Sequence, residues 1–249
     1  MTNFKMTVEK VSEIINNLIT GQSAPAKELR RLMNVVAKSN STVLIQGATG
    51  TGKELVARGI HDASGRKGPL VSVNCAAIPS ELLESELFGH EKGSFTGADK
   101  LRVGRFEQSN AGSLFLDEIG DMPLSLQSKL LRAIENRSIQ RVGGTKDLPV
   151  DLRLICATHQ NIESFVEEGK FRADLFFRIN VFPISVPSLA ERAADIPQIV
   201  NIMLKDLEKR GENIPIFDQS AVLELGRYNW PGNVRELRNV IERAAVLFA

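Results

Sequence analysis

The sequence predicts an α/β fold, in which a parallel sheet is sandwiched by helices, followed by a small all-helical domain. Short apolar runs alternate with helical patterns through most of the chain. These runs are continuously apolar, as expected for parallel strands that helices cover on both faces. After Pro187 the strand signal ends and helical patterns alone remain, which separates a second domain from the first.

The first element expected is a short amphipathic helix near the N-terminus. Apolar residues recur at helical spacing among polar ones at Val8, Val11, Ile14, Ile15 and Leu18, the pattern of a helix with one buried face. A turn-like stretch follows at 20–23, and a second helical pattern runs through residues 29–36. We assign residues 1–20 to an N-terminal linker segment that precedes the α/β domain.

The next elements alternate between strands and helices. Four aliphatic or β-branched runs bounded by turn residues are expected as strands: Thr42–Gln46, Leu70–Asn74, Ser113–Asp117 and Arg153–Thr158. Helical patterns lie between them at Gly52–Ala63, Pro79–Leu87 and Leu124–Asn136, and three more follow near Asp195–Arg210, Asp218–Arg227 and Asn233–Leu247. We therefore expect an α/β nucleotide-binding domain over 21–187 and a helical lid domain over 188–249.

Composition excludes several classes of protein. Lys and Arg number 31 against 30 Asp and Glu, so the basic excess of a nucleic-acid-binding protein is missing and direct DNA binding is not expected. Cys75, Cys156 and the three histidines lack metal-ligand spacing, and both cysteines lie in apolar runs, which predicts buried, reduced thiols. No apolar stretch approaches the ~20 residues of a membrane span, so we expect a cytoplasmic protein that does not bind a membrane.

A glycine-rich loop after the first strand predicts a phosphate site. The run Gly47-Ala48-Thr49-Gly50-Thr51-Gly52-Lys53-Glu54 joins a strand to a helix, the context that a P-loop requires. Its glycines let several backbone N–H groups point at one anion, and the helix N-terminus adds about half a positive charge. Lys53 would reach the β- and γ-phosphates. Glu54 stands where most P-loops place a hydroxyl on magnesium, so it is a second candidate metal ligand.

Two acids at the end of a later strand predict the second half of this site. Asp117 and Glu118 follow the apolar run 113–116. Asp117 would hold Mg²⁺ at the carboxyl end of the sheet, and Glu118 would polarise the attacking water. Taken alone, such an acid pair is as often a solvated loop. Paired with the P-loop, it indicates a nucleotide-hydrolysing site.

At this point the sequence resembles one family, the AAA+ motor domain of NtrC-class sigma-54-dependent transcription activators. The most specific motif is the run Gly93-Ser94-Phe95-Thr96-Gly97-Ala98 within residues 84–98. The family carries a GAFTGA loop here, inserted in a helix, which contacts sigma-54. The resemblance therefore implies that these six residues contact sigma-54, with Ser94 in the place of the usual alanine. Without this family resemblance, we would favour an ordinary surface loop in which the Phe95 ring packs against the protein.

The same resemblance implies roles for residues around the phosphate site. Gly21 matches a glycine near the adenine. Asn74 matches a residue that can hold the hydrolytic Glu, here Glu118, inactive through a hydrogen bond. Thr158 and His159 match the sensor of the γ-phosphate region. Strand-end capping is the plain alternative for Asn74 and Thr158.

Three arginines complete the resemblance. Arg172 and Arg178, in the run 171–178, match two arginine fingers that reach into the site of a neighbouring subunit. Arg235, in the run Trp230-Pro231-Gly232-Asn233-Val234-Arg235-Glu236-Leu237, matches the lid sensor of the nucleotide. Trans-acting fingers imply a homo-oligomeric ring, a hexamer or heptamer in this family. The family's Leu-Arg-Glu-Arg run reads Leu-Ala-Glu-Arg at 189–192, and Ala194 stands where an acid is common, which puts hinge salt bridges in doubt.

The expected function is ATP hydrolysis, with ATP and Mg²⁺, coupled to remodelling of the sigma-54 RNA polymerase holoenzyme. The family's DNA-binding helix-turn-helix is not in this chain, so we expect a motor domain separated from its DNA-binding domain. Two other functions stay open: a different AAA+ machine such as an unfoldase or loader, and a regulatory module that binds nucleotide without hydrolysing it. The Phe95-Thr96 loop argues against the first, and the intact acids and arginines argue against the second. The sequence does not indicate the regulated genes, the activating signal, the resting oligomer or a second ligand.

Overall fold

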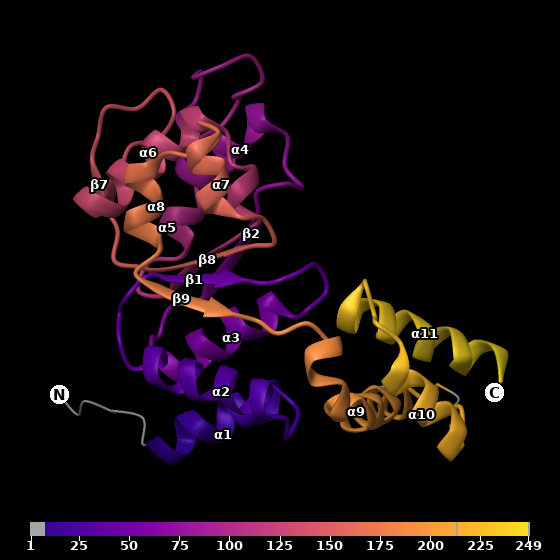
Figure 1. Cartoon of the computed structure of the whole chain (residues 1–249). Helices are drawn as coiled ribbons and strands as arrows, with labels where there is room; N and C mark the ends of the chain where they lie inside the picture. The colour runs from indigo at the N-terminus through magenta and orange to yellow at the C-terminus, as the bar shows by residue number, and fades with distance from the viewer. Residues whose placement is uncertain (1–7, 213, 249) are drawn as a thin grey trace.

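The computed structural model describes residues 8–212 and 214–248 (Figure 1). The first seven residues of the expected 1–20 segment and the last residue of the expected lid lie outside this range. The described residues form an α/β domain and a separate group of C-terminal helices beside it.

The α/β domain is built on a five-stranded sheet in which all strand pairs are parallel. The strand order is β2 (Leu70–Asn74), β5 (Ser113–Asp117), β8 (Arg153–Thr158), β1 (Val43–Gln46) and β9 (Phe182–Ser185). The predicted fold class is confirmed. The expected strands occur as predicted, except that β1 begins one residue later than expected.

The edge strand β9 was not predicted. It pairs with β1 so that Leu44 lies opposite Pro183. Proline has no N–H to donate and is tolerated at a sheet edge, so the run Phe182–Ser185 lacks a strong strand pattern although tertiary pairing makes it a strand.

Helices cover both faces of the sheet. Alternate residues of each strand point to opposite faces: Leu114 and Leu116 join one core, whereas Phe115 joins the other. The helices on the face of Leu114 are α4 (Ser80–Phe88), α5 (Arg105–Gln108), α6 (Leu124–Asn136), α7 (Ile162–Glu167) and α8 (Ala173–Ile179). Those on the face of Phe115 are α1 (Val8–Leu18), α2 (Ala24–Ala37) and α3 (Lys53–Ser64). Figure 1 shows these two layers above and below the strands.

The helix predicted near the N-terminus is part of the second core. Val11 and Ile15 of α1, and Ile19 just after it, are buried against α2 and α3. The described part of the 1–20 segment is therefore packed on the α/β domain.

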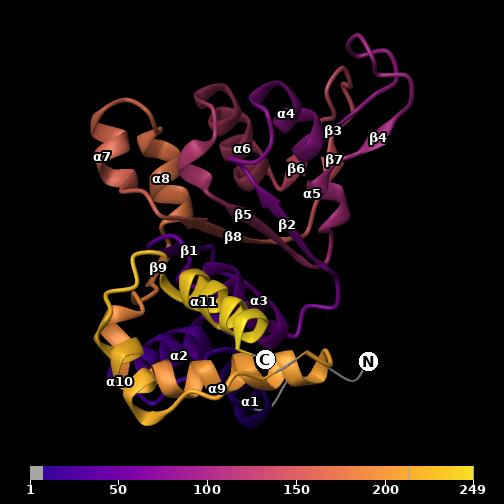
Figure 2. The same ribbon diagram turned by 90° about the vertical axis from the view of Figure 1, so that its right-hand side faces the viewer.

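Two short hairpins project from the α4–α6 layer. The first joins β3 (Gly89–His90) to β4 (Arg102–Val103), and the second joins β6 (Ser138–Ile139) to β7 (Leu148–Pro149). They touch through a bridge between His90 and Val142. Figure 2 shows the first hairpin extending beyond the helices.

The C-terminal helices form a small unit with its own core. It comprises the 3₁₀ helix η2 (Ala190–Asp195), α9 (Ile196–Lys209), α10 (Gln219–Arg227) and α11 (Asn233–Leu247). Its apolar core includes Leu189, Leu237 and Trp230, and is separate from both sheet cores. The three predicted helical stretches are confirmed. None of the helices within residues 8–248 is long and apolar enough to cross a membrane.

Candidate functional site

The P-loop connects β1 to α3 and wraps around the N-terminus of that helix. Gly50 and Gly52 have φ values of 80° and 102°, in the left-handed region that favours glycine. Lys53, the first residue of α3, is buried, and its Nζ donates a hydrogen bond to Gly47 O at 3.0 Å. Gly47 N in turn donates to Thr158 O of β8 at 3.2 Å. The loop is therefore anchored to the centre of the sheet at its first residue.

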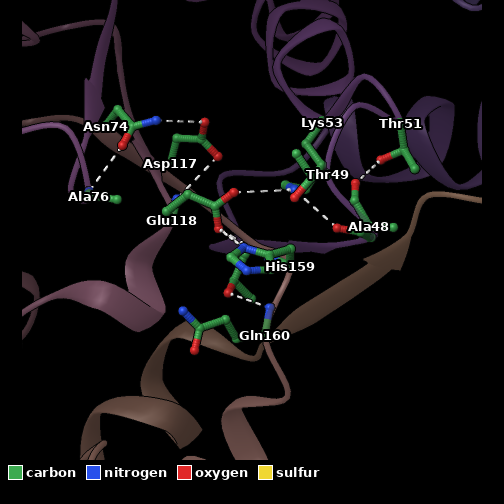
Figure 3. A network of polar contacts seen from close by, with 12 residues as sticks. Ala48, Thr49, Thr51, Lys53, Asn74, Ala76, Asp117, Glu118, His159 and Gln160 are labelled. Carbon is green, nitrogen blue, oxygen red and sulfur yellow. Dashed lines mark hydrogen bonds and ion pairs between the residues drawn. The ribbon is translucent and has the colours of Figure 1, made fainter. Parts of the chain in front are cut away.

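The two predicted acids lie beside each other at the carboxyl edge of the sheet, and one of them contacts Lys53 (Figure 3). Asp117 is the last residue of β5, and Glu118 follows with φ 51°. Glu118 Oε1 lies 3.5 Å from Lys53 Nζ. Its other oxygen, Oε2, lies 2.7 Å from His159 Nδ1 and accepts the backbone N–H of His159 at 3.2 Å. The structure thus brings the P-loop, the acid pair and the end of β8 together.

Asn74 does not make the contact that the resemblance implies. Its Nδ2 lies 3.4 Å from Asp117 Oδ2, while its Oδ1 accepts the N–H groups of Ala76 and Ala77, each at 3.0 Å. The expected hydrogen bond to Glu118 is not formed in this structure: Asn74 caps the turn after β2, and its neighbour on β5 is Asp117. The register explains this, because Asn74 and Asp117 lie directly opposite each other. Glu118 is held by His159 instead.

The contacts of the two acids shift their pKa values in opposite directions. Burial disfavours the charged form of Glu118, but the hydrogen bond from His159 and the charge of Lys53 outweigh it, so its pKa lies below its ordinary value. Burial and the adjacent negative charge of Glu118 raise the pKa of Asp117. Glu118 is thus held as an anion, whereas Asp117 carries a charge that its surroundings do not fully compensate.

This uncompensated charge suits a divalent cation. Asp117 offers carboxylate oxygens, the donors that Mg²⁺ prefers, and Glu54 is near enough to raise its pKa further. Within the described part of the chain, no cluster of three or more His, Cys, Asp or Glu could hold a metal by itself. The donors therefore fit an ion shared between the protein and a phosphate ligand.

The remaining predicted neighbours of the site lie around this edge. Thr158, the last residue of β8, is fully buried, and its Oγ1 accepts the N–H of Gln160 at 3.0 Å, as in the capping alternative. Gly21 has φ 132° and packs so closely on Asp195 that a Cβ would lie 2.2 Å from the carboxylate. Asp195 also accepts the N–H groups of Gln22 and Ser23, so the start of α2 is tied to the lid.

The lid also reaches the P-loop. A Cβ built on Gly50 would lie 3.1 Å from the Cβ of Arg235, the predicted lid sensor. A cavity of about 110 Å³ opens beside Thr51 and Gly52, and its walls come from the end of α1, the P-loop and the lid. The sequence did not predict the role of Asn233, whose side chain donates to Thr49 O at 3.0 Å. The sequence signal that could have indicated this role is an asparagine directly after Pro-Gly, at the position where a helix begins.

The two predicted arginine fingers lie on a different part of the domain. Arg172 precedes α8 and forms an exposed ion pair with Asp174 at 2.7 Å. Arg178 is exposed near the end of α8 and lines a cavity of about 260 Å³, together with Arg66 and Arg137, at the amino ends of β1 and β8. Among the described residues, no hydrogen bond or ion pair joins either arginine to the P-loop of the same chain.

The loop at 93–98 forms the tip of the β3–β4 hairpin, between α4 and α5. Its ends meet through a hydrogen bond from Gly93 N to Ala98 O at 2.8 Å. Phe95 is 42% exposed, and its ring meets His90 edge-on at 4.9 Å. Thr96 is exposed at the tip. The loop therefore presents one aromatic ring and one hydroxyl to solvent.

The cysteines are buried and free, as predicted. Burial and the negative charge of Asp117 raise the pKa of Cys75 to about 12, and burial also raises the pKa of Cys156. Both thiols therefore stay protonated near neutral pH and are poor nucleophiles.

Comparison with known proteins decides the family. The sigma-54 interaction domain matches residues 19–185, and the AAA+ ATPase lid domain matches residues 190–249. The chain belongs to the sigma-54 interaction domain family. The predicted resemblance is confirmed, and the P-loop, the acid pair and the loop at 93–98 all lie within this sigma-54 interaction domain.

Individual relatives agree with this assignment. The sigma-54 interaction domain and its lid are 50% identical to the DNA-binding transcriptional activator HyfR of Escherichia coli, over 94% of this chain and 36% of HyfR. They are 52% identical to the Nif-specific regulatory protein of Azorhizobium caulinodans, over 92% of this chain and 37% of that protein. The chain therefore spans between a third and two fifths of the length of these relatives.

Solved structures show the same fold. Crystal structures of NtrX from Brucella abortus in complex with ADP and with ATP superpose with a TM-score of 0.85, at 44% and 43% identity, respectively. They cover 91% and 92% of this chain and 50% of the NtrX chain in each case.

Proposed function

We propose that this chain hydrolyses ATP and uses the reaction to remodel the sigma-54 RNA polymerase holoenzyme in the cytoplasm. The observation that carries the proposal is the ion pair between Lys53 and Glu118, with Asp117 beside it, at the edge where the P-loop begins. The nucleotide complexes of NtrX support ATP as the ligand. The balanced charge of the chain supports a protein partner rather than direct contact with DNA.

In this proposal the P-loop binds the phosphates and the adjacent cavity receives the base. The N–H groups of the loop and the N-terminus of α3 favour an anion, and Lys53 adds a full positive charge. The cavity beside Thr51 is mostly apolar, with Leu18, Val56 and Met203 among its walls, which suits an aromatic ring. Asp117, with Glu54 nearby, would hold Mg²⁺, which neutralises charge on the phosphates when bound.

Glu118 is the residue best placed to activate the attacking water. It is ionised and 14% exposed, so it can accept a proton or orient a water molecule. The contact with His159 turns one of its oxygens away from that task. We propose that this is a resting arrangement, which Glu118 leaves when nucleotide occupies the site.

The exposed arginines complete the site from a second copy of the chain. Arg178 has no acidic partner among the described residues, while Arg172 is paired with the exposed Asp174. Because neither reaches its own P-loop, we propose that they stabilise the transferring phosphate in a neighbouring subunit of a ring. The loop at 93–98, with Phe95 and Thr96 exposed, would contact sigma-54.

Mixing two inactive variants tests the shared site. Glu118→Gln removes the base of its own site, and Arg178→Ala removes the arginine that its chain lends to the next site. Each variant alone should release phosphate slowly. A mixture should regain part of the wild-type rate, because some sites then combine an intact Glu118 with an intact Arg178. A mixture as inactive as either variant, under conditions where both assemble, would exclude the shared site.

The dependence of rate on concentration tests the same proposal without mutation. Phosphate release per wild-type subunit should rise with protein concentration, because the ring forms by mass action, and sigma-54 should be captured when a transition-state analogue is bound. A constant rate per subunit over the range in which the oligomer forms would contradict trans catalysis.

A further inference from the structure

The lid grips the P-loop through the backbone of the loop. Three consecutive carbonyl groups of the loop accept hydrogen bonds from lid residues. These are Thr49 O from Asn233 Nδ2 at 3.0 Å, Gly50 O from Val234 N–H at 3.0 Å, and Thr51 O from Arg192 Nη2 at 3.2 Å. We call these three hydrogen bonds the tie between lid and loop. Because the loop contributes only backbone carbonyls to the tie, the tie does not depend on the side chains of the loop.

Asn233 is the centre of this tie. The residue is 2% exposed, and both ends of its side-chain amide are used: Oδ1 accepts the N–H of Leu189 at 2.8 Å, and Nδ2 donates to Thr49 O. Its φ of 52° lies in the left-handed region, which asparagine tolerates better than most residues. One side chain thus links the P-loop, the segment that enters the lid and the start of α11.

The start of α11 adds a second contact. Val234 N–H belongs to the first turn of the helix, where N–H groups lack an intrahelical partner, and Gly50 O supplies the acceptor. The approach is close enough that a Cβ on Gly50 would lie 2.2 Å from Gly232 O. The fit between lid and loop therefore depends on the absence of a side chain at Gly50.

The geometry of the peptide bond gives this tie a consequence. In a trans peptide the C=O and the following N–H point in opposite directions. Fixing the carbonyls of residues 49–51 toward the lid therefore directs the following N–H groups toward the other side of the loop. The N–H of Thr51 donates there to Ala48 O at 3.4 Å, which leaves those of Gly50 and Gly52 for a ligand. Such N–H groups hold the phosphate in a P-loop, and ordering them before the ligand arrives lowers the cost of binding.

We propose that Asn233 is a positioning residue for phosphate binding: lid docking through its amide preorganises the N–H groups of the P-loop. The inference rests on the proposed nucleotide function and adds a regulation to it. Loss of the Asn233 contact while the lid stays docked weakens the binding of the phosphates, whereas contacts with the base in the adjacent cavity are less affected. A lid that moved away altogether would weaken both, because lid residues such as Met203 also line that cavity.

Two substitutions separate this role from general stability. Asn233→Gly removes all three hydrogen bonds of the side chain, the third being a long one to Pro231 O at 3.5 Å, and still adopts the left-handed conformation. Asn233→Asp keeps the acceptor for Leu189 N–H and loses the donor toward Thr49 O. If the glycine variant does not fold, the aspartate variant is compared with wild type in its place. Asn201→Gly, on the exposed face of α9, is the matched control for loosening a lid helix.

Affinities for ADP and AMP measure the effect, because the two ligands differ by the β-phosphate. We expect Asn233→Gly to bind ADP about tenfold more weakly, the size of a lost hydrogen-bonded tie, and AMP within about twofold of wild type. Asn201→Gly should bind both ligands as wild type does. Calorimetry gives the affinities. Emission from Trp230, the only tryptophan of the chain, whose carbonyl accepts the N–H of Asn233 at 2.8 Å, should respond less to ADP in Asn233→Gly.

The outcomes distinguish this inference from the proposed function. If wild type binds ADP and Asn233→Gly binds it equally well, the inference is overturned and the proposed function stands. An equal loss of ADP and AMP affinity also overturns the inference, because Asn233 would then support the whole cleft rather than the phosphate grip. A wild-type chain that binds neither nucleotide overturns both.

Discussion

The carboxyl edge of the sheet and the tip of the first hairpin are held in opposite ways. At the edge, Lys53 is buried and Glu118 has a partner for each oxygen. At the tip, Phe95 and Thr96 are exposed, and nothing lies near a Cβ built on Gly93 or Gly97. The edge suits fixed charges that act on a small ligand, whereas the tip suits a contact that forms and breaks with a large partner.

This contrast predicts that damage at the edge affects chemistry and binding of nucleotide, whereas damage at the tip affects the partner. The largest effect is expected for Glu118→Gln. Loss of the carboxylate should lower turnover by about 10²- to 10⁴-fold, the usual contribution of general base catalysis, and leave ATP affinity within about twofold. Phosphate release and calorimetry measure the two quantities. Glu167→Gln, at an exposed position of α7, should change neither, and normal turnover of Glu118→Gln would remove this residue from the mechanism.

Lys53→Ala should affect the same edge through binding. The variant loses a charge-assisted contact with phosphate, worth about 1.5–3 kcal/mol, so ATP affinity should fall by roughly 10- to 100-fold. Titration calorimetry gives this value, with Lys205→Ala on the exposed face of α9 as the control. Unchanged affinity would show that the glycine-rich loop does not bind the phosphates.

Thr96→Ala tests the opposite end of the comparison. Basal ATPase should stay within about twofold of wild type, because the hydroxyl is remote from the acid pair. Capture of sigma-54 with a transition-state analogue should be lost in a pull-down or native gel. Ser220→Ala, at an exposed position of the lid, should keep both properties. Capture by Thr96→Ala at the wild-type level would give the hairpin tip a different role.

The smallest effect is expected for Ser94→Ala. The Ser94 hydroxyl is buried and has no hydrogen-bond partner among the described residues, which costs free energy of folding. Its removal should stabilise the protein by about 1 kcal/mol and raise Tm by about 2–4 °C. Differential scanning calorimetry checks this value against Ser220→Ala. A lower Tm would mean that the hydroxyl makes a stabilising contact.

Short sequence patterns predicted the strands, the P-loop and the lid helices, because the residues within each segment determine its conformation. The buried strands are continuously apolar, and Gly50 and Gly52 of the P-loop adopt the backbone that only glycine adopts easily. The edge Lys53–Asp117–Glu118 could be predicted because parallel strands end at one side of a sheet. The three lid helices could also be predicted, because their apolar residues recur at helical spacing.

Contacts between distant segments were harder to predict. The register of β2 on β5 sets Asn74 opposite Asp117 rather than Glu118, and no single-strand pattern contains that register. Strand β9 depends on pairing with β1, which overrides the weak propensity of a segment with Pro183. Asn233 lies 184 residues from Thr49, so its contact could be inferred only after the lid had been placed on the loop.

The order of strands also constrains how the chain emerges during translation. Val43 of β1 pairs with Ile155 on one side and Phe182 on the other, so the strand that leads into the P-loop has no neighbour until more than a hundred further residues have been synthesised. Parallel pairing over such separations forms slowly and leaves apolar strands exposed meanwhile. A nascent chain that stalled before Arg153 would therefore present β1 as unpaired apolar surface, a natural target for chaperones.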